Sequence, residues 1–312
     1  MRRIDLFKVY SVAFFFLYLL MQGCIGDDLT ECGVSLRYQY TRNVDGTDKL
    51  ASEIKKVNLY VFDSAGIFLD EYITDAKYLN GMNMVKLNLP PGKYSFVAWG
   101  NLGSDYELPA FEKGKTTIDQ ATLSLKRIGK TVSNHPEALF FGSLSQTDIL
   151  PALWKNQVLT INMTKDTNKI RIIAKGLSAQ DLAQKNFSCR IVSANGDYKF
   201  DNSLNGSEKL EYIPKLSIDE LGQMISDFVI MRELKDGSTQ SRLIFTYHSP
   251  DGGPDKEISN INLTELLLSQ SKTKDLDIDD YFEIELTLNF TNGNATIHIK
   301  GWSTIDTGNP VG

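Results

Sequence analysis

The sequence predicts an all-β protein made of two β-sandwiches in tandem, with a few short helices. Apolar and polar residues alternate in short runs along most of the chain, turn residues separate these runs, and helical patterns are few and brief. A length of 312 residues with 42% hydrophobic side chains is enough for two packed cores. We expect one sandwich at residues 34–165 and the second at 166–312, with the polar segment "TKDTN" at 164–168 as the boundary.

The N-terminal residues 1–23 have the layout of an export signal. Basic side chains among the first eight residues precede an uncharged, apolar run at 9–21. Such a run spans about 20 Å as a helix, short of the roughly 30 Å core of a bilayer, so a permanent span is the weaker interpretation. A glycine precedes Cys24, which predicts a lipoprotein signal and a lipid on the Cys24 thiol. Met21 and Gln22 fit this signal loosely, and an ordinary signal peptide is the alternative.

Residues 24–33 form a lipidated, acidic linker in this interpretation, with Asp27 and Asp28 close behind Cys24. The whole chain has a net charge of −6, and the signal carries three basic and one acidic side chain, so the mature protein stands at about −8. Because a polyanion partner requires clustered lysine and arginine, nucleic-acid binding is disfavoured. Cys32 and Cys189 either pair in an oxidising compartment or stay as two separate thiols.

The strands of the first half follow a period of two. They are expected at 34–40 ("VSLRYQY"), in a hairpin at 57–72 ("VNLYVF" and "IFLDEY" around "DSAG"), in a second hairpin at 84–100 ("MVKLNL" and "YSFVAWG" around "PPGK"), and at "ATLSLK", "ALFFG" and "VLTINM".

The second half repeats the pattern. Strands are expected at "KIRIIAKG", "FSCRIVS", "DFVIM", "RLIFTYH" and "EISNINL", and a final hairpin pairs "YFEIELTLNF" with "ATIHIKGW" around "TNGN". Short helices are expected at "SAQDLAQ" near residue 178, at "IDELGQMI" near residue 218, and at "NLTELLLSQ", where Asn262 or Thr264 is the expected cap.

The sequence contains no recognisable catalytic or metal-binding constellation, so we predict no catalytic residues, no metal and no cofactor. His135, His248 and His298 are isolated along the chain, and His298 fits a strand face better than a ligand role. The string "DLDIDD" at 275–280 has oxygen ligands at alternate positions but lacks the glycine of a calcium loop, so we interpret it as a solvated turn.

The three tryptophans are possible contacts for a sugar ligand on composition alone. Trp99 and Trp302 lie in or beside alternating strands and are expected in a core. Trp154 lies in the loop "LPALWKNQ" and is the one candidate ligand contact.

The segments "CIGDDLTEC", "VNLYVFDSAGIF" and "PPGKYSFVAWGN" resemble the FimB-like family, the outer-membrane anchor subunits of Bacteroides-type (type V) fimbriae; "LFFGS" and the "GW" at 301–302 fit more loosely. The resemblance implies two transthyretin-like sandwiches, a lipid on Cys24, and a surface-display role for Asp27 and Asp28. Cys32 matches the second cysteine of the family. The implied function is to hold the base of a fimbria in the outer membrane, with a stalk subunit as partner, and to end fimbrial growth.

The implied mechanism depends on the first strand. Stalk subunits of this class lose an N-terminal strand to a protease and accept a strand from a neighbour. Here Cys24 lies ten residues before Val34, so a cut after Arg37 or Arg42 would release the protein from the membrane. We therefore expect the strand at 34–40 to stay in place. The polar tail after Trp302 makes a poor donor strand, so either "ATIHIKGW" or another surface contacts the stalk.

Two other functions stay open on the sequence. The chain could be a surface glycan-binding lipoprotein that uses Trp154, or an accessory or tip fimbrial adhesin. An enzyme is disfavoured because the catalytic constellations are missing.

Overall fold

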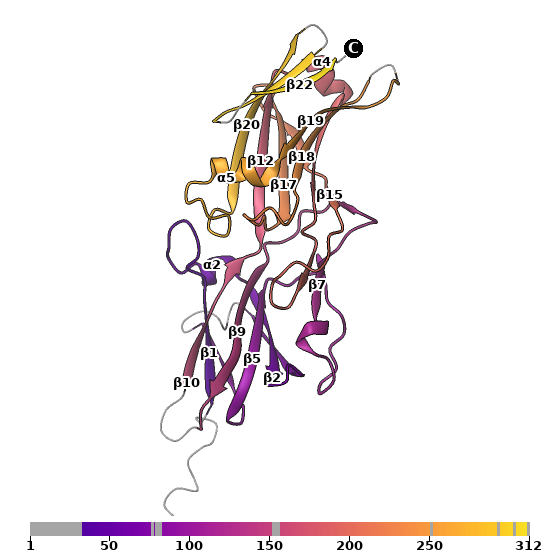
Figure 1. Cartoon of the computed structure of the whole chain (residues 1–312). Helices are drawn as coiled ribbons and strands as arrows, with labels where there is room; N and C mark the ends of the chain where they lie inside the picture. The colour runs from indigo at the N-terminus through magenta and orange to yellow at the C-terminus, as the bar shows by residue number, and fades with distance from the viewer. Residues whose placement is uncertain are drawn as a thin grey trace, which may run out of the picture.

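The computed structural model describes residues 33–75, 78, 83–151, 157–249, 252–291, 294–301 and 304–310. Within these residues the chain is mostly β-strand, with short helices, and its strands form five sheets that are arranged along one elongated molecule (Figure 1). The prediction of an all-β chain with two sandwiches and few short helices is confirmed.

The first sandwich packs a three-stranded sheet against a five-stranded sheet. The first has the order β10 (Gln157–Asn162), β1 (Val34–Gln39), β4 (Met84–Leu87), and the second β11 (Thr164–Lys165), β9 (Phe140–Ile149), β5 (Gly92–Gly100), β2 (Lys56–Asp63), β3 (Phe68–Asp75). Their facing side chains form one buried cluster, which includes Leu36, Leu59 and Phe96. This core arises from the alternating runs of the sequence, because every second side chain points inward.

The second sandwich packs a six-stranded against a five-stranded sheet. The first has the order β16 (Lys215–Ile218), β17 (Met224–Met231), β12 (Thr167–Lys175), β20 (Tyr281–Thr291), β21 (Asn294–Ile299), β22 (Thr304–Pro310), and the second β19 (Lys256–Asn262), β18 (Arg242–Tyr247), β13 (Phe187–Ser193), β15 (Leu210–Tyr212), β8 (Thr131–Val132). The expected final hairpin is present, since β20 and β21 pair antiparallel.

The two halves of the chain share sheets. A three-stranded sheet combines β6 (Tyr106–Glu107) and β7 (Thr122–Leu125) of the first half with β14 (Asp197–Lys199) of the second. In addition, β8 of the first half pairs in parallel with β15 of the second. The two sandwiches are therefore joined by strand pairing as well as by the covalent chain.

The polar segment at 164–168 lies inside this junction. Lys165, Asp166, Thr167 and Asn168 are all buried, and the chain passes through them directly from β11 into β12. The division at residues 165 and 166 stays a prediction.

The predicted hairpin at 84–100 is wrong. β4 pairs with β1, whereas β5 pairs with β2 and β9, so the "PPGK" turn carries the chain from one sheet of the sandwich to the other. Two consecutive prolines lack the N–H groups that a continued ladder would need, which suits a crossing better than a tight hairpin.

The predicted helix near residue 218 is also wrong, because this segment is the β16–β17 hairpin. The carboxylate of Asp219 accepts hydrogen bonds from the backbone N–H groups of Leu221 and Gln223, and Gly222 adopts a positive φ of 74°. An aspartate and a glycine at these positions stabilise a turn against a helix.

The other two helices are confirmed. α4 (Ala179–Gln184) begins at the N-cap Ser178, whose hydroxyl accepts a hydrogen bond from the N–H of Asp181. α5 (Leu263–Gln270) begins at the N-cap Asn262, one of the two expected caps. A third helix, α2 (Leu50–Glu53), is a single turn.

Candidate anchoring and assembly site

The residues predicted to carry the lipid and the surface-display signal lie outside the described residues. This applies to Cys24, Asp27, Asp28 and Cys32, and equally to the candidate ligand contact Trp154. Their roles stay predictions.

The first strand, β1, lies in the middle of its sheet. It pairs in parallel with β10 over all six of its residues and antiparallel with β4 over Val34–Arg37. Val34, Leu36 and Tyr38 point into the first core with at most 1% of their surface exposed. Because both edges and one face of β1 are occupied, removing this strand would expose two sheet edges and open the core.

Arg37 and Arg42, after which a protease could cut, lie in different structural surroundings. Arg37 is exposed, but its backbone lies in the ladder between Thr160 of β10 and Met84 of β4. Arg42 follows the strand and forms ion pairs with Asp275 at 3.1 Å and Asp277 at 3.0 Å. A protease needs an extended, unpaired substrate segment, so cleavage after Arg37 requires β1 to leave its sheet first.

The chain enters β1 through a tight contact. A Cβ atom at Gly33 would lie 2.8 Å from the carbonyl oxygen of Leu87, so only glycine fits this close approach to β4. The start of β1 thus rests directly against the first sandwich. In Figure 1, β1 lies in the half of the molecule that is opposite to β22 and the C-terminal end.

The C-terminal strand, β22, forms one edge of the six-stranded sheet and pairs antiparallel with β21. Most of the candidate donor segment "ATIHIKGW" lies in β21, which is hydrogen-bonded to β20 on one side and to β22 on the other. An inner strand is a poor candidate for donation to a partner, because its removal breaks two ladders.

The acidic string at 275–280 is not simply a solvated turn, and that interpretation is corrected here. Asp275 and Asp277 bind Arg42 of the first half, and Asp280 binds the buried Lys165 at 2.5 Å. Lys165 also binds Glu53 at 2.8 Å. The string therefore joins the two halves by ion pairs, which the one-dimensional pattern cannot reveal.

Hydrogen bonds fix the base of the same turn. Asp279 is buried and accepts hydrogen bonds from the Ser271 hydroxyl at 2.5 Å and from the backbone N–H of Thr273 at 2.9 Å. Burial acts to raise the pKa of Asp279, but these hydrogen bonds outweigh it and hold that pKa below its usual value.

A buried carboxylate lies at the junction itself. Asp166 is fully buried, accepts a hydrogen bond from Asn202, and has the guanidinium of Arg232 at 3.5 Å. Burial raises the pKa of Asp166 to about 6, although Arg232 and the Asn202 amide act in the opposite direction.

Aromatic rings fill the junction beside these charges. Phe200, which follows β14, lies between Tyr60 and Phe62 of β2, with centroid distances of 5.2 Å and 6.2 Å. It also contacts Trp99 at 6.0 Å and Phe111 at 5.3 Å. The outer face of the first five-stranded sheet is thus covered by Phe200 of the second half together with residues of the first half such as Phe111. The prediction that Trp99 lies in a core is confirmed, since its side chain is fully buried.

His248 has polar partners in the fold that its isolated position in the sequence does not reveal. Its Nε2 lies 2.8 Å from the Ser188 hydroxyl, and its Nδ1 lies 2.9 Å from Asp255. Ser188, His248 and Asp255 thus form a hydrogen-bonded row that links β13, the end of β18 and the residue before β19. Its neighbour Phe187 points inward, so Ser188 faces outward and lines neither of the two described cavities. His298 lies exposed on β21, as predicted.

Other expected features can be checked within the described part of the chain. There, no group of three or more His, Cys, Asp or Glu side chains is placed to hold a metal ion. Cys189 is a free, buried thiol, and burial raises its pKa to about 12, which makes it unreactive at neutral pH. Among the same residues, no helix is both long and apolar enough to cross a bilayer.

Residues 28–308 match the protein family described as "Fimbrillin-A associated anchor proteins Mfa1 and Mfa2". The chain is 23% identical over 294 residues to the minor fimbrium anchoring subunit Mfa2 of Porphyromonas gingivalis, covering 89% of this chain and 87% of that protein.

Two crystal structures show the same fold. That of the fimbrial anchor protein Mfa2 from Porphyromonas gingivalis matches with a TM-score of 0.72 and 22% identity, covering 88% of this chain and 98% of the other. A candidate adhesin from Bacteroides ovatus matches with a TM-score of 0.77 and 22% identity, covering 90% of this chain and 97% of the other.

Proposed function

The chain belongs to the family of fimbrillin-A associated anchor proteins Mfa1 and Mfa2, and from this premise we propose that it is a fimbrial anchor subunit. In this proposal Cys24 carries the lipid that holds the protein in the outer membrane. Asp27 and Asp28 direct it to the cell surface. A stalk subunit binds the part of the molecule that is remote from the lipid.

The observation that carries the proposal is the position of β1 in the middle of its sheet. This strand is paired on both edges and buried on one face, and it begins ten residues after Cys24. A subunit that keeps its first strand has no vacant position there for the strand of another subunit. We infer that this is how the anchor ends the polymer, because the same strand is also its tether to the membrane.

The junction between the sandwiches suits a mechanical role. We propose that residues 34–165 and 166–312 are two sandwiches that move as one body, since shared sheets, the Phe200 cluster and the Lys165 ion pairs connect them. A force applied to the stalk would then reach the membrane without bending a linker.

The lipid provides the strength of attachment. A single acyl chain holds a protein at a membrane only marginally, with a binding constant of about 10⁴ M⁻¹, whereas several chains on one residue hold it firmly. Anchoring therefore depends on Cys24 and on the complete acylation that a bacterial lipoprotein receives.

Replacement of the lipidated thiol tests the proposal. We expect Cys24→Ala protein to leave the outer-membrane fraction and to appear in the periplasm or the medium, and immunogold labelling to place the wild-type protein at the fimbrial base. Cys189→Ala is the matched control, because it removes a cysteine that is buried in the second core.

The two aspartates allow a second, independent readout. Asp27→Ala/Asp28→Ala protein should still fractionate with the outer membrane but should lose antibody labelling on intact cells. If Cys24→Ala protein remains in the outer-membrane fraction, or if gold labels the fimbrial tip, the anchor proposal is wrong.

A further inference from the structure

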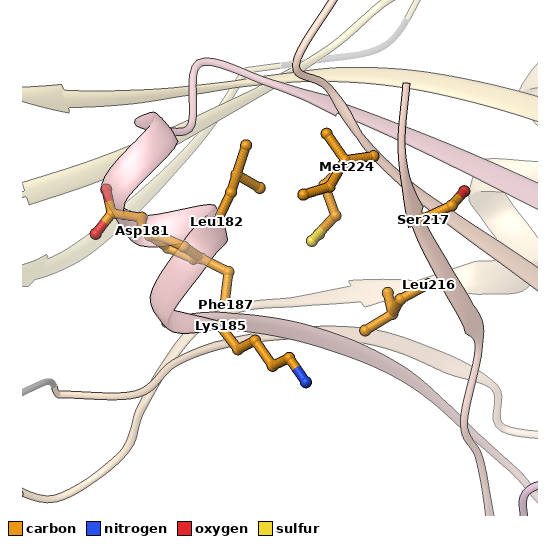
Figure 2. Close-up of a pocket in the computed structure, with 8 residues that line it drawn as sticks. Asp181, Leu182, Lys185, Phe187, Leu216, Ser217 and Met224 are labelled. Carbon is orange, nitrogen blue, oxygen red and sulfur yellow. The ribbon is translucent and has the colours of Figure 1, made fainter. Parts of the chain in front are cut away.

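An apolar groove lies between α4 and β16, in the second sandwich. It has a volume of about 440 Å³ and is lined mainly by Leu182, Phe187, Leu216, Ile218 and Met224. Figure 2 shows the side chains of Leu182 and Met224 directed into the space between the helix and the strand, with Leu216 on the opposite wall. In Figure 1, α4 lies at the same end of the molecule as β22 and far from β1.

One wall of this groove is an open sheet edge. β16 is the terminal strand of the six-stranded sheet and pairs with β17 on one side only. The N–H of Asp219 donates to the carbonyl of Gln223, and hydrogen-bonded pairs alternate with non-bonded pairs in an antiparallel ladder. The pairs of Leu216 and Ile218 are therefore non-bonded, so their N–H and C=O groups point away from β17, toward the open edge.

The same two residues expose apolar side chains. Leu216 is 50% exposed and Ile218 is 55% exposed, although they lie on the same sheet face as the buried Met224. These side chains point toward the interior of the sandwich, but no strand covers them. Edge strands of soluble proteins usually carry a charge, a proline or a bulge at such positions, and at Leu216 and Ile218 β16 has none of these.

Two opposite charges lie at the mouth of the groove, the carboxylate of Asp181 and the ammonium group of Lys185. Asp181 is held by the Ser178 hydroxyl and by the Asn186 amide, which lies 3.1 Å away. Lys185 is exposed, has a positive φ of 56°, and extends its ammonium group from the end of α4 toward Leu216 (Figure 2). A ligand with a carboxylate would meet this ammonium group, against the net negative charge of the whole chain.

We propose that this groove binds an extended segment of a fimbrial partner subunit, which adds a strand to β16 and places apolar side chains at alternate positions on Leu216 and Ile218. A carboxylate of the same segment faces Lys185. An acyl chain would fill the apolar space, but it could not pair with the outward N–H and C=O groups, so the open edge favours a peptide. The identity of the partner rests on the proposed anchoring function, and the site is separate from the position of β1.

The test compares variants of the full-length mature lipoprotein in binding to the purified major stalk subunit of the same strain and to synthetic peptides from its two terminal segments. Leu216→Lys places a charge on the edge, and Ile218→Pro removes an outward N–H that is not part of the β17 ladder. We expect each to weaken binding at least tenfold. Leu221→Lys is the matched control, because Leu221 is 80% exposed on the same hairpin and does not line the groove.

A separate set of binding measurements tests the ammonium group of Lys185 at the mouth of the groove. Lys185→Glu should weaken binding, and a peptide whose acidic residue is changed to lysine should restore binding to this variant. If Leu216→Lys and Ile218→Pro bind like the wild type, the inference is wrong while the anchoring function stands. If the wild-type protein binds no stalk subunit, this inference and the proposed anchoring function both fail. A wild-type dimer that Leu216→Lys dissociates in analytical ultracentrifugation would overturn the inference in favour of a second copy of this chain.

Discussion

Truncation of Leu36 is the sharpest test of whether β1 is an integral strand. Leu36 is fully buried in the first core, on the middle strand of its sheet. Replacement of a buried leucine by alanine costs about 2–5 kcal/mol, because it removes apolar contact and leaves a cavity. The neighbouring Arg37 is exposed, so Arg37→Ala should change the free energy of unfolding by no more than about 0.5 kcal/mol.

Urea unfolding followed by circular dichroism measures the loss of global stability. With a slope of about 2–3 kcal/mol per molar urea, Leu36→Ala should lower the midpoint by about 1–2 M, whereas Arg37→Ala should leave it in place. If the two sandwiches unfold in separate steps, the first core is expected to show the shift.

Cleavage by an arginine-specific protease measures the opening of β1 itself. The backbone of Arg37 is paired on both sides, so the strand must open before it can be cut. A loss of 2–5 kcal/mol corresponds to a cleavage rate after Arg37 that is at least about 30-fold higher in Leu36→Ala protein. If the native wild-type protein is cut rapidly after Arg37, and Leu36→Ala does not change that rate, then β1 does not hold the tether and the proposed termination mechanism is refuted.

Three further predictions concern the junction. Lys165→Ala should destabilise the fold by about 3–5 kcal/mol, because it leaves the carboxylates of Glu53 and Asp280 without their buried partner. The control Lys55→Ala removes an exposed lysine and should cost less than about 1 kcal/mol. Urea unfolding of both variants measures the two changes in the free energy of unfolding. Phe200→Ala should cost about 3–5 kcal/mol and shift the tryptophan fluorescence toward longer wavelength, and an unchanged spectrum would contradict the packing of Phe200 on Trp99. The raised pKa of Asp166, about 6 in the fold, means that its unfavourable contribution grows as pH rises from about 4 to 6. The wild type should therefore lose about 2 kcal/mol relative to Asp166→Asn over this range; parallel stability curves would contradict it.

Much of the strand pattern could be predicted because it depends on local chemistry. The segment "FSCRIVS" is β13 residue for residue, and Asn262 caps α5 as its side chain dictates. Period-two alternation decides which side chains face a core, and it is written in the order of the residues. It does not say which strands are neighbours, so the predicted pairing of β4 with β5 failed.

The sequence alone predicted the export signal, and it determined the position of Cys24 ten residues before the first strand, the all-β class and the resemblance to fimbrial anchors, because each of these depends on residues close together in the chain. The tertiary structure decided the position of β1 between β10 and β4, the binding of Arg42 to the acidic string, and the open edge of β16 beside α4. These features join residues that are tens to hundreds of positions apart. Their geometry is set by how the sheets pack against one another, and no local pattern records that packing.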